Sequence, residues 1–94
     1  MEILDTVEKF KRRIESFRNL EKDFDSYNSD PPSELAIENA LKGLNEIDKR
    51  GLIPDYVDAG CADEIIMQVN TGECFEEWSF YSDGEILMMK SSFN

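Results

Sequence analysis

The stretch that decides the fold is Glu64-Ile-Ile-Met-Gln-Val-Asn-Thr-Gly-Glu-Cys-Phe-Glu-Glu-Trp-Ser-Phe-Tyr-Ser-Asp-Gly-Glu-Ile-Leu-Met-Met-Lys90. Apolar side chains recur there with a period near two, and β-branched and aromatic residues are frequent. This pattern predicts three β-strands over residues 64–69, 74–81 and 85–90. Turn-forming residues separate the strands, beginning with Asn70-Thr-Gly-Glu73, so we expect two consecutive hairpins in an antiparallel meander.

The two turns predict the register of the strands. The first sets Val69 opposite Cys74, and a two-residue Asp83-Gly84 turn sets Glu77 opposite Lys90. Both turns place the same side chains on one buried face: Ile65, Met67, Val69, Cys74, Trp78, Phe80, Leu87 and Met89. The opposite face keeps an apolar group that calls for a second covering helix or a partner: Ile66, Phe75, Tyr81, Ile86 and Met88.

Two helices are predicted before the strands. Apolar residues step by three and four from the N-terminus, which predicts an amphipathic helix over about residues 2–24. Ser33 is a suitable N-cap for a second helix over about residues 33–50, and Gly51 supplies the left-handed residue that ends it.

The remaining segments are predicted to be connections. Pro31-Pro32 excludes helix immediately before it, and the residues around Asp55 and Asp58 are expected to form a loop. The predicted fold class is therefore α+β, with two N-terminal helices followed by a three-stranded antiparallel β-meander. We expect one domain that spans residues 1–94.

Charge is segregated along the chain. The net charge is -11; residues 51–89 contain nine carboxylates and no Lys, Arg or His, whereas residues 1–50 contain nine of the ten basic residues. Such a negative field favours cationic partners and repels nucleic acid and anionic membranes. The expected partner is a basic protein surface, with no direct binding of nucleic acid or membrane.

Carboxylates that project from strands and turns can imitate a row of phosphates and occupy the Lys/Arg surface of a nucleic-acid-binding protein. The sequence then predicts a stoichiometric inhibitor of a nucleic-acid-binding effector or toxin. Phage anti-defence proteins such as anti-CRISPR proteins, antitoxins and immunity proteins are the classes considered. The candidate partner-binding residues are Asp63, Glu64, Glu73, Phe75, Glu76, Glu77, Tyr81, Asp83 and Glu85. The alternative is that these acids only keep the protein soluble.

Two further alternatives stay open. A self-associating structural module, which would form a homodimer, would use the second sheet face or the first helix. A degenerate calcium-binding loop would use Asp23, Asp25 and Glu34, which match positions 1, 3 and 12 of an EF-hand loop. Tyr27 and Asn28 depart from that pattern, and no metal or cofactor is expected.

Catalysis is not expected from this chain. Without histidine, acid–base chemistry would rest on carboxylates alone, and a chain of 94 residues leaves little room for a substrate cleft. Cys61 and Cys74 are read as reduced packing or surface thiols. The N-terminal residues lack a secretory signal and no run is apolar enough to span a membrane, so a cytoplasmic location is expected.

One segment carries a resemblance, based on Phe24-Asp-Ser-Tyr27, Pro31-Pro-Ser-x-x-Ala36-Ile37, the Trp78 strand and the Asp83-Gly84 turn. These features resemble a group of small uncharacterised bacterial and phage proteins with a Trp-Asp-Ser/Gly-Tyr-Gly signature before a Pro-rich helix start. Here Phe24 stands in place of the Trp and Asn28 in place of the Gly. The resemblance implies a bacterial or phage origin and supplies no mechanism.

Overall fold

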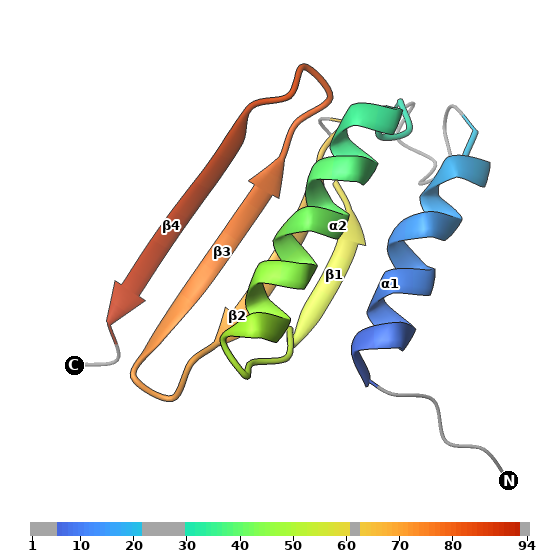
Figure 1. Cartoon of the computed structure of the whole chain (residues 1–94). Helices are drawn as coiled ribbons and strands as arrows, with labels where there is room; N and C mark the ends of the chain where they lie inside the picture. Colours follow the sequence, from blue (N-terminus) through green and yellow to red (C-terminus); the bar gives the residue numbers. More distant parts are fainter. Residues whose placement is uncertain (1–5, 22–29, 61–62, 93–94) are drawn as a thin grey trace, which may run out of the picture.

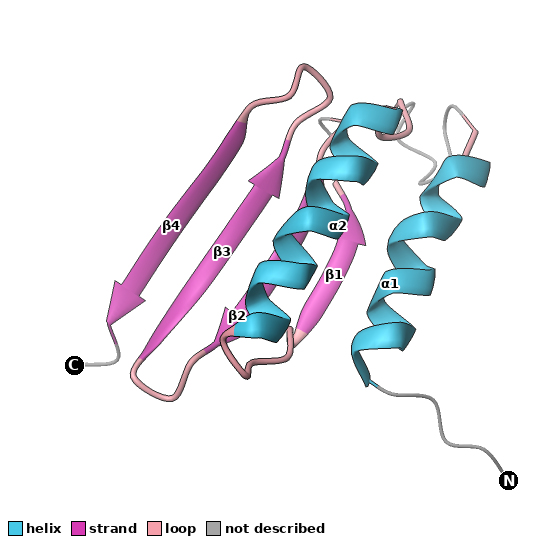
Figure 2. Ribbon diagram, in the orientation of Figure 1, coloured by secondary structure: helices cyan, strands magenta, loops and turns pink. Residues whose placement is uncertain are grey.

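The computed structural model describes residues 6–21, 30–60 and 63–92. Its elements are α1 (Thr6–Ser16), the 3₁₀ turn η1 (Phe17–Asn19), α2 (Glu34–Lys49), β1 (Tyr56–Ala59), β2 (Ile65–Asn70), β3 (Cys74–Phe80) and β4 (Ile86–Ser92). The strands form one antiparallel sheet in the order β1-β2-β3-β4 (Figures 1 and 2). The fold is α+β, but the prediction of a three-stranded sheet was wrong because the sheet has four strands.

The strand that the sequence did not predict is β1. Its four residues are too few to show a period of two, and Val57 is its one buried side chain. Val57 lies opposite Met67 of β2. The Arg13 Nε of α1 donates to the Val57 carbonyl oxygen at 2.7 Å, and Arg13 Nη2 lies 3.0 Å from Asp58 Oδ1. Contacts with α1 and β2 therefore hold a segment that the sequence assigned to a loop.

The first helix ends earlier than residue 24. After Ser16 the chain tightens into η1, and Leu20 is extended, with φ -73° and ψ 144°. The apolar spacing continues through this point, but Arg18 of η1 turns to the carboxylate of Glu34 at the start of α2. That contact joins residues far apart in sequence, so a helical repeat cannot reveal it. Residues 22–24 lie outside the described part of the chain.

Both predicted ends of α2 are confirmed. The Ser33 Oγ accepts a hydrogen bond from the Ala36 backbone N–H at 3.2 Å, as an N-cap does. At the other end Gly51 has φ +76°, and the Leu52 N–H donates to the Ile47 carbonyl oxygen at 3.1 Å. This is the hydrogen bond of a Schellman motif, which requires a left-handed residue such as Gly51.

The two helices cover one face of β1, β2 and β3, while β4 extends beyond them (Figure 1). Between helices and sheet lies the core: Ile14, Phe17, Ala36, Ile37, Ala40, Leu44, Ile47, Val57, Ile65, Met67, Val69 and Phe80. The approach of α2 to β3 is close, because a Cβ atom added to Gly43 would lie 2.6 Å from Phe80 Cζ.

The register of β2 with β3 differs from the prediction by an even number of residues. Val69 lies opposite Glu76, not Cys74. The chain reverses through Gly72 and Glu73, where Gly72 has φ +90° and the Thr71 N–H donates to the Cys74 carbonyl oxygen at 2.9 Å. Because side chains alternate with a period of two, this shift leaves every β2 and β3 side chain on its predicted face.

The register of β3 with β4 differs by one residue, which has the opposite effect. Three residues, Ser82 to Gly84, form the loop, with Gly84 at φ +96° and a 2.8 Å hydrogen bond from the Tyr81 N–H to the Glu85 carbonyl oxygen. Lys90 therefore lies opposite Glu76 instead of Glu77. The predicted faces of β4 were wrong: Ile86 and Met88 are on the helix side, and Leu87 and Met89 are on the open side.

A candidate protein-binding surface

Ser82, in the loop between β3 and β4, connects three segments at one end of the sheet. The Ser33 N–H donates to Ser82 Oγ at 3.0 Å, and the Ser33 hydroxyl donates to the Ser82 carbonyl oxygen at 2.9 Å. The Ser82 hydroxyl in turn donates to the Asp63 carbonyl oxygen at 2.6 Å. The start of α2, the residues before β2 and the β3–β4 loop are thus held together.

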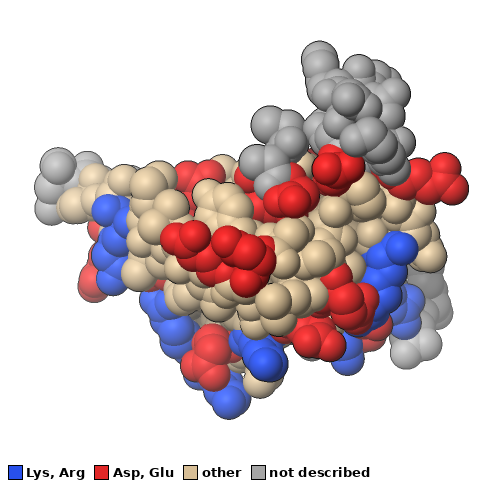
Figure 3. All heavy atoms as spheres, turned by 90° about the horizontal axis from the view of Figure 1, so that it is seen from above, with Lys and Arg blue, Asp and Glu red and all other residues tan. Residues whose placement is uncertain are grey.

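The segments that meet here form what we call the acidic end: residues 17–21, 30–35, 63–64 and 81–85. Among these residues are seven carboxylates and one cation: Glu21, Asp30, Glu34, Asp63, Glu64, Asp83, Glu85 and Arg18. Figure 3 views the molecule from this side, with carboxylates across the middle of the view and most basic groups along its margins. The end is therefore strongly negative.

The one cation of the acidic end is paired. Arg18 Nε donates to both carboxylate oxygens of Glu34, at 2.9 and 3.0 Å, and Arg18 Nη2 donates to one of them at 2.8 Å. These hydrogen bonds lower the pKa of Glu34 below its ordinary value and raise that of Arg18. The proposed calcium loop needs this carboxylate, whereas Asp23 and Asp25 lie outside the described residues.

The other predicted residues of this end differ in exposure. Asp83 and Glu85 are exposed, and Asp83 Oδ1 accepts a hydrogen bond from the Glu85 N–H at 2.9 Å. Asp63 is half-buried and has φ +53°. Glu64 is only 8% exposed. The structure therefore brings Asp63, Asp83 and Glu85 together on one accessible end, with Tyr81 half-buried at the start of the β3–β4 loop.

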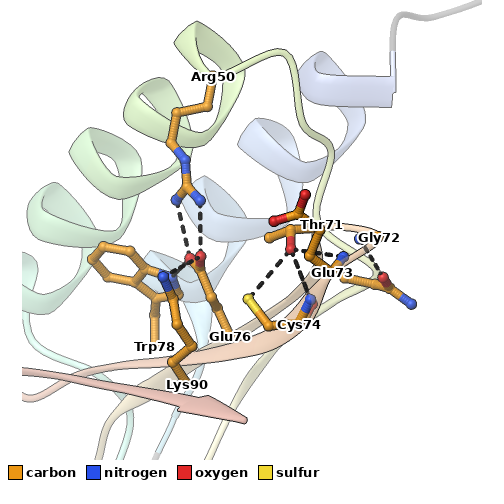
Figure 4. Close-up of polar contacts among 9 residues, drawn as sticks. Arg50, Thr71, Gly72, Glu73, Cys74, Glu76, Trp78 and Lys90 are labelled. Carbon is orange, nitrogen blue, oxygen red and sulfur yellow. Dashed lines mark hydrogen bonds and ion pairs between the residues drawn. The ribbon is translucent and has the colours of Figure 1, made fainter. Parts of the chain in front are cut away.

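Glu76 is buried instead of lying on the surface, and Figure 4 shows the polar groups that contact its carboxylate. Arg50 Nη1 donates to Glu76 Oε1 at 3.0 Å and Nη2 donates to Oε2 at 2.8 Å. The Trp78 indole N–H donates to Oε1 at 3.2 Å, and Lys90 Nζ lies 3.9 Å from Oε2. One carboxylate thus connects the end of α2 to β3 and β4.

The partners of Glu76 determine its protonation. Hydrogen bonds from Arg50 and Trp78, with the charges of Arg50 and Lys90, lower the pKa of Glu76 below its ordinary value of 4.5, although burial acts in the opposite direction. The Arg50 guanidinium has a raised pKa for the same reason. Glu76 is therefore charged at neutral pH, and both of its carboxylate oxygens accept hydrogen bonds within the protein. Its role is to stabilise the fold, and it is not part of the candidate binding surface.

The remaining predicted residues lie on other parts of the sheet. Phe75 and Glu77 are half-buried on the open face, which is the face of the sheet turned away from α1 and α2 (Figure 1). Glu73 is exposed in the β2–β3 turn at the opposite end of the sheet. The predicted set therefore divides between the acidic end, the open face, the far turn and the interior.

An apolar groove between α1 and α2 is lined by Val7, Lys11, Leu41, Leu44 and Asn45. Within residues 6–21, 30–60 and 63–92, no three His, Cys, Asp or Glu side chains are grouped to hold a metal ion. Neither helix there has the length and apolar character required to cross a membrane.

Sequence reasoning missed the residues that assemble the acidic end. Ser33 was recognised as an N-cap, but its contact with Ser82 joins positions 49 residues apart, and no local pattern marks such a contact. Arg18 fell within the first predicted helix, over about residues 2–24, with no role of its own. Their roles could be predicted only if it were known which loops meet in space.

The residues that carry most of the resemblance to bacterial and phage proteins, Phe24 to Tyr27, lie outside the described residues. No protein-family model matches the chain, and no curated protein or solved structure matches it significantly.

Proposed function

We propose that this protein is a small acidic binding module that engages a basic surface of another protein. The observation that carries the proposal is the acidic end, where the hydrogen bonds of Ser82 and the Arg18–Glu34 ion pair hold together segments that bear seven described carboxylates and a single, paired arginine. A surface of this kind attracts and orients Lys/Arg-rich partners.

The class of partner that fits best is a nucleic-acid-binding protein, such as a phage-defence effector or a toxin in the cytoplasm. Its phosphate-binding surface carries the Lys and Arg side chains that carboxylates can occupy. Because the segments of the acidic end are connected by hydrogen bonds, little conformational entropy is lost when a partner binds. The module would then exclude nucleic acid from that surface by direct competition.

Three carboxylates are the sharpest test of this function. In the triple variant Asp63→Asn, Asp83→Asn, Glu85→Gln, the side chains keep their shapes and lose their charges. Asparagine at position 63 tolerates the left-handed backbone of Asp63. Asparagine at position 83 retains the side-chain oxygen that accepts from the Glu85 N–H. The matched control, Glu46→Gln, Asp48→Asn, Glu73→Gln, changes the net charge equally without altering the acidic end. The proposed surface excludes Glu73, because Glu73 lies in the turn at the opposite end of the sheet.

The experiment is affinity capture from nuclease-treated bacterial lysate, followed by competition with nucleic acid for the purified captured protein. We expect the parent chain and the control variant to capture a nucleic-acid-binding protein and release its nucleic acid at a one-to-one ratio, and the triple variant to do neither. Capture that all three chains share, or capture without displacement of nucleic acid, would refute the proposed function.

A further inference from the structure

The last strand, β4, is an edge of the sheet with apolar side chains exposed on both faces. Ile86 is 48% exposed, Leu87 45%, Met88 43% and Met89 55%, and these residues are consecutive. Figure 1 shows the reason: both helices lie to one side of β4, and the main sheet contacts of α2 are with β2 and β3. Four neighbouring large apolar side chains are more than an isolated exposed residue and indicate a contact surface.

The backbone of β4 has hydrogen-bonding capacity on its outer side. The Tyr81 N–H donates to the Glu85 carbonyl oxygen, so the Glu85 carbonyl faces the neighbouring strand. In an antiparallel pair the backbone groups of every second residue face the same way. Leu87 and Met89 therefore direct their N–H and C=O groups to β3. Those of Ile86, Met88 and Lys90 point outward, where another strand can be added.

The two edge strands of the sheet, β1 and β4, differ in how open they are to pairing with another strand. At β1, the Arg13 side chain of α1 binds the Val57 carbonyl oxygen and Asp58, so this edge is covered. At β4, the devices that usually block strand addition are scarce: residues 86–92 contain no proline and a single charge, Lys90. Within the described sheet, β4 is thus the edge open to a partner.

We propose that β4 pairs antiparallel with β4 of a second copy of this chain, joining two four-stranded sheets into one of eight strands. This inference does not depend on the proposed function. Two copies with a net charge of -11 each repel one another, so they can approach best where carboxylates are absent. The strand β4 contains no carboxylate and carries the only basic residue after Arg50, which makes it the suitable meeting point.

The outward backbone groups restrict the register. In an antiparallel pair the outward-facing residues of both copies must exchange hydrogen bonds, so Ile86, Met88 and Lys90 lie opposite one another. Lys90 opposite Lys90 is disfavoured, because like charges directly opposite destabilise a sheet. The register with Met88 opposite Met88 places Lys90 opposite Ile86, and Leu87 opposite Met89 on the open face. The two-fold axis then passes between the two Met88 residues, perpendicular to the sheet.

The two other surfaces first considered for self-association are less suitable. The apolar stripe of α1 is used inside the molecule, since Ile14 is 0% and Phe17 4% exposed. The open face carries Glu77, whose charge opposes a face-to-face contact with an identical copy. Pairing at β4 extends the open face without placing Glu77 directly opposite its copy.

The experiment measures molar mass by light scattering over a range of concentrations. We expect the full chain to form a dimer. Met88→Pro removes an outward N–H but none of the β3–β4 hydrogen bonds, so it should weaken the dimer about tenfold or more. Met88→Ala keeps the backbone donor and should weaken it less. A monomer at every concentration, or a dimer that Met88→Pro leaves unchanged, overturns the proposal.

A pair of charge variants tests the axis and does not depend on whether the proline variant folds. Met88→Lys and Met88→Glu should each be monomeric, because equal charges meet at the axis. Mixed together they should form a one-to-one heterodimer. If either variant alone remains dimeric, or the mixture stays monomeric, Met88 does not face Met88 and the register is wrong. Met88 lies outside the acidic end, so these results leave the proposed function to its own test.

Discussion

Glu76 of β3 and Arg50 at the end of α2 form a bidentate ion pair, with nitrogen–oxygen distances of 3.0 and 2.8 Å. The Glu76 side chain is 1% exposed and that of Arg50 is 42% exposed. The pair therefore holds a buried carboxylate through an arginine that water still reaches, and it fixes the C-terminal end of α2 on the sheet.

Glu76→Gln should destabilise the protein by about 1–2 kcal/mol, since a buried charge-assisted hydrogen bond is lost while exposed Arg50 recovers part of its hydration. Urea denaturation provides the measurement. Glu73→Gln is the matched control, because Glu73 is exposed and close in sequence. Equal stability of both variants would show that the Glu76 pair contributes nothing to the fold.

The same pair predicts a pH dependence. The folded-state pKa of Glu76 lies below the ordinary value of 4.5, chiefly because Arg50 donates to its carboxylate. The unfolded state then binds the proton more readily, so the contribution of Glu76 is complete above pH 4.5 and is lost as the pH falls through the folded pKa. Melting temperatures of Glu76→Gln should fall less steeply with acid than those of the parent. Parallel acid curves would contradict the lowered pKa.

Gly43→Ala tests the close contact between α2 and β3. Alanine favours a helix by about 1 kcal/mol over glycine. Here, however, the added Cβ would lie 2.6 Å from Phe80 Cζ in the core. Overpacking of this kind costs about 1–3 kcal/mol, so we expect a net loss of stability. In a Phe80→Leu background the same change should become neutral or favourable. A gain in the parent background would show that the ring moves aside freely.

Gly51→Val tests the end of α2. Gly51 has φ +76° with no atom within 4 Å of an added Cβ, so the penalty is backbone strain alone. A β-branched residue there should cost about 1–2 kcal/mol, and Gly51→Asn should cost less because asparagine tolerates this conformation. Thermal unfolding of the two variants would distinguish strain from a general sensitivity of the site.

Local patterns were sufficient for much of the fold. The N-cap at Ser33 and the stop at Gly51 are specified by neighbouring residues, and both were predicted correctly. The β2 and β3 faces were also correct, because the alternation of Ile65, Met67 and Val69 survives a shift of two residues.

Tertiary contacts and loop length account for the errors. The strand β1 depends on Arg13 and on pairing with β2, neither of which a four-residue pattern reveals. The faces of β4 were reversed because the Asp83-Gly84 loop includes Ser82 as a third residue, and its position is fixed by hydrogen bonds to Ser33 and Asp63. Glu76 was counted among surface acids because burial beside Arg50 has no signature in composition.

If the acidic end binds a basic protein surface, the association rate of the captured partner should depend on salt, and it is best measured at low and at physiological salt. We expect the rate of the parent chain and of Glu46→Gln, Asp48→Asn, Glu73→Gln to fall steeply as salt rises, because exposed charges are screened over about 8–10 Å. Asp63→Asn, Asp83→Asn, Glu85→Gln should associate more slowly and with little dependence on salt. If association is equally fast at both salt concentrations and is unchanged by this triple substitution, the acidic end does not bind the partner.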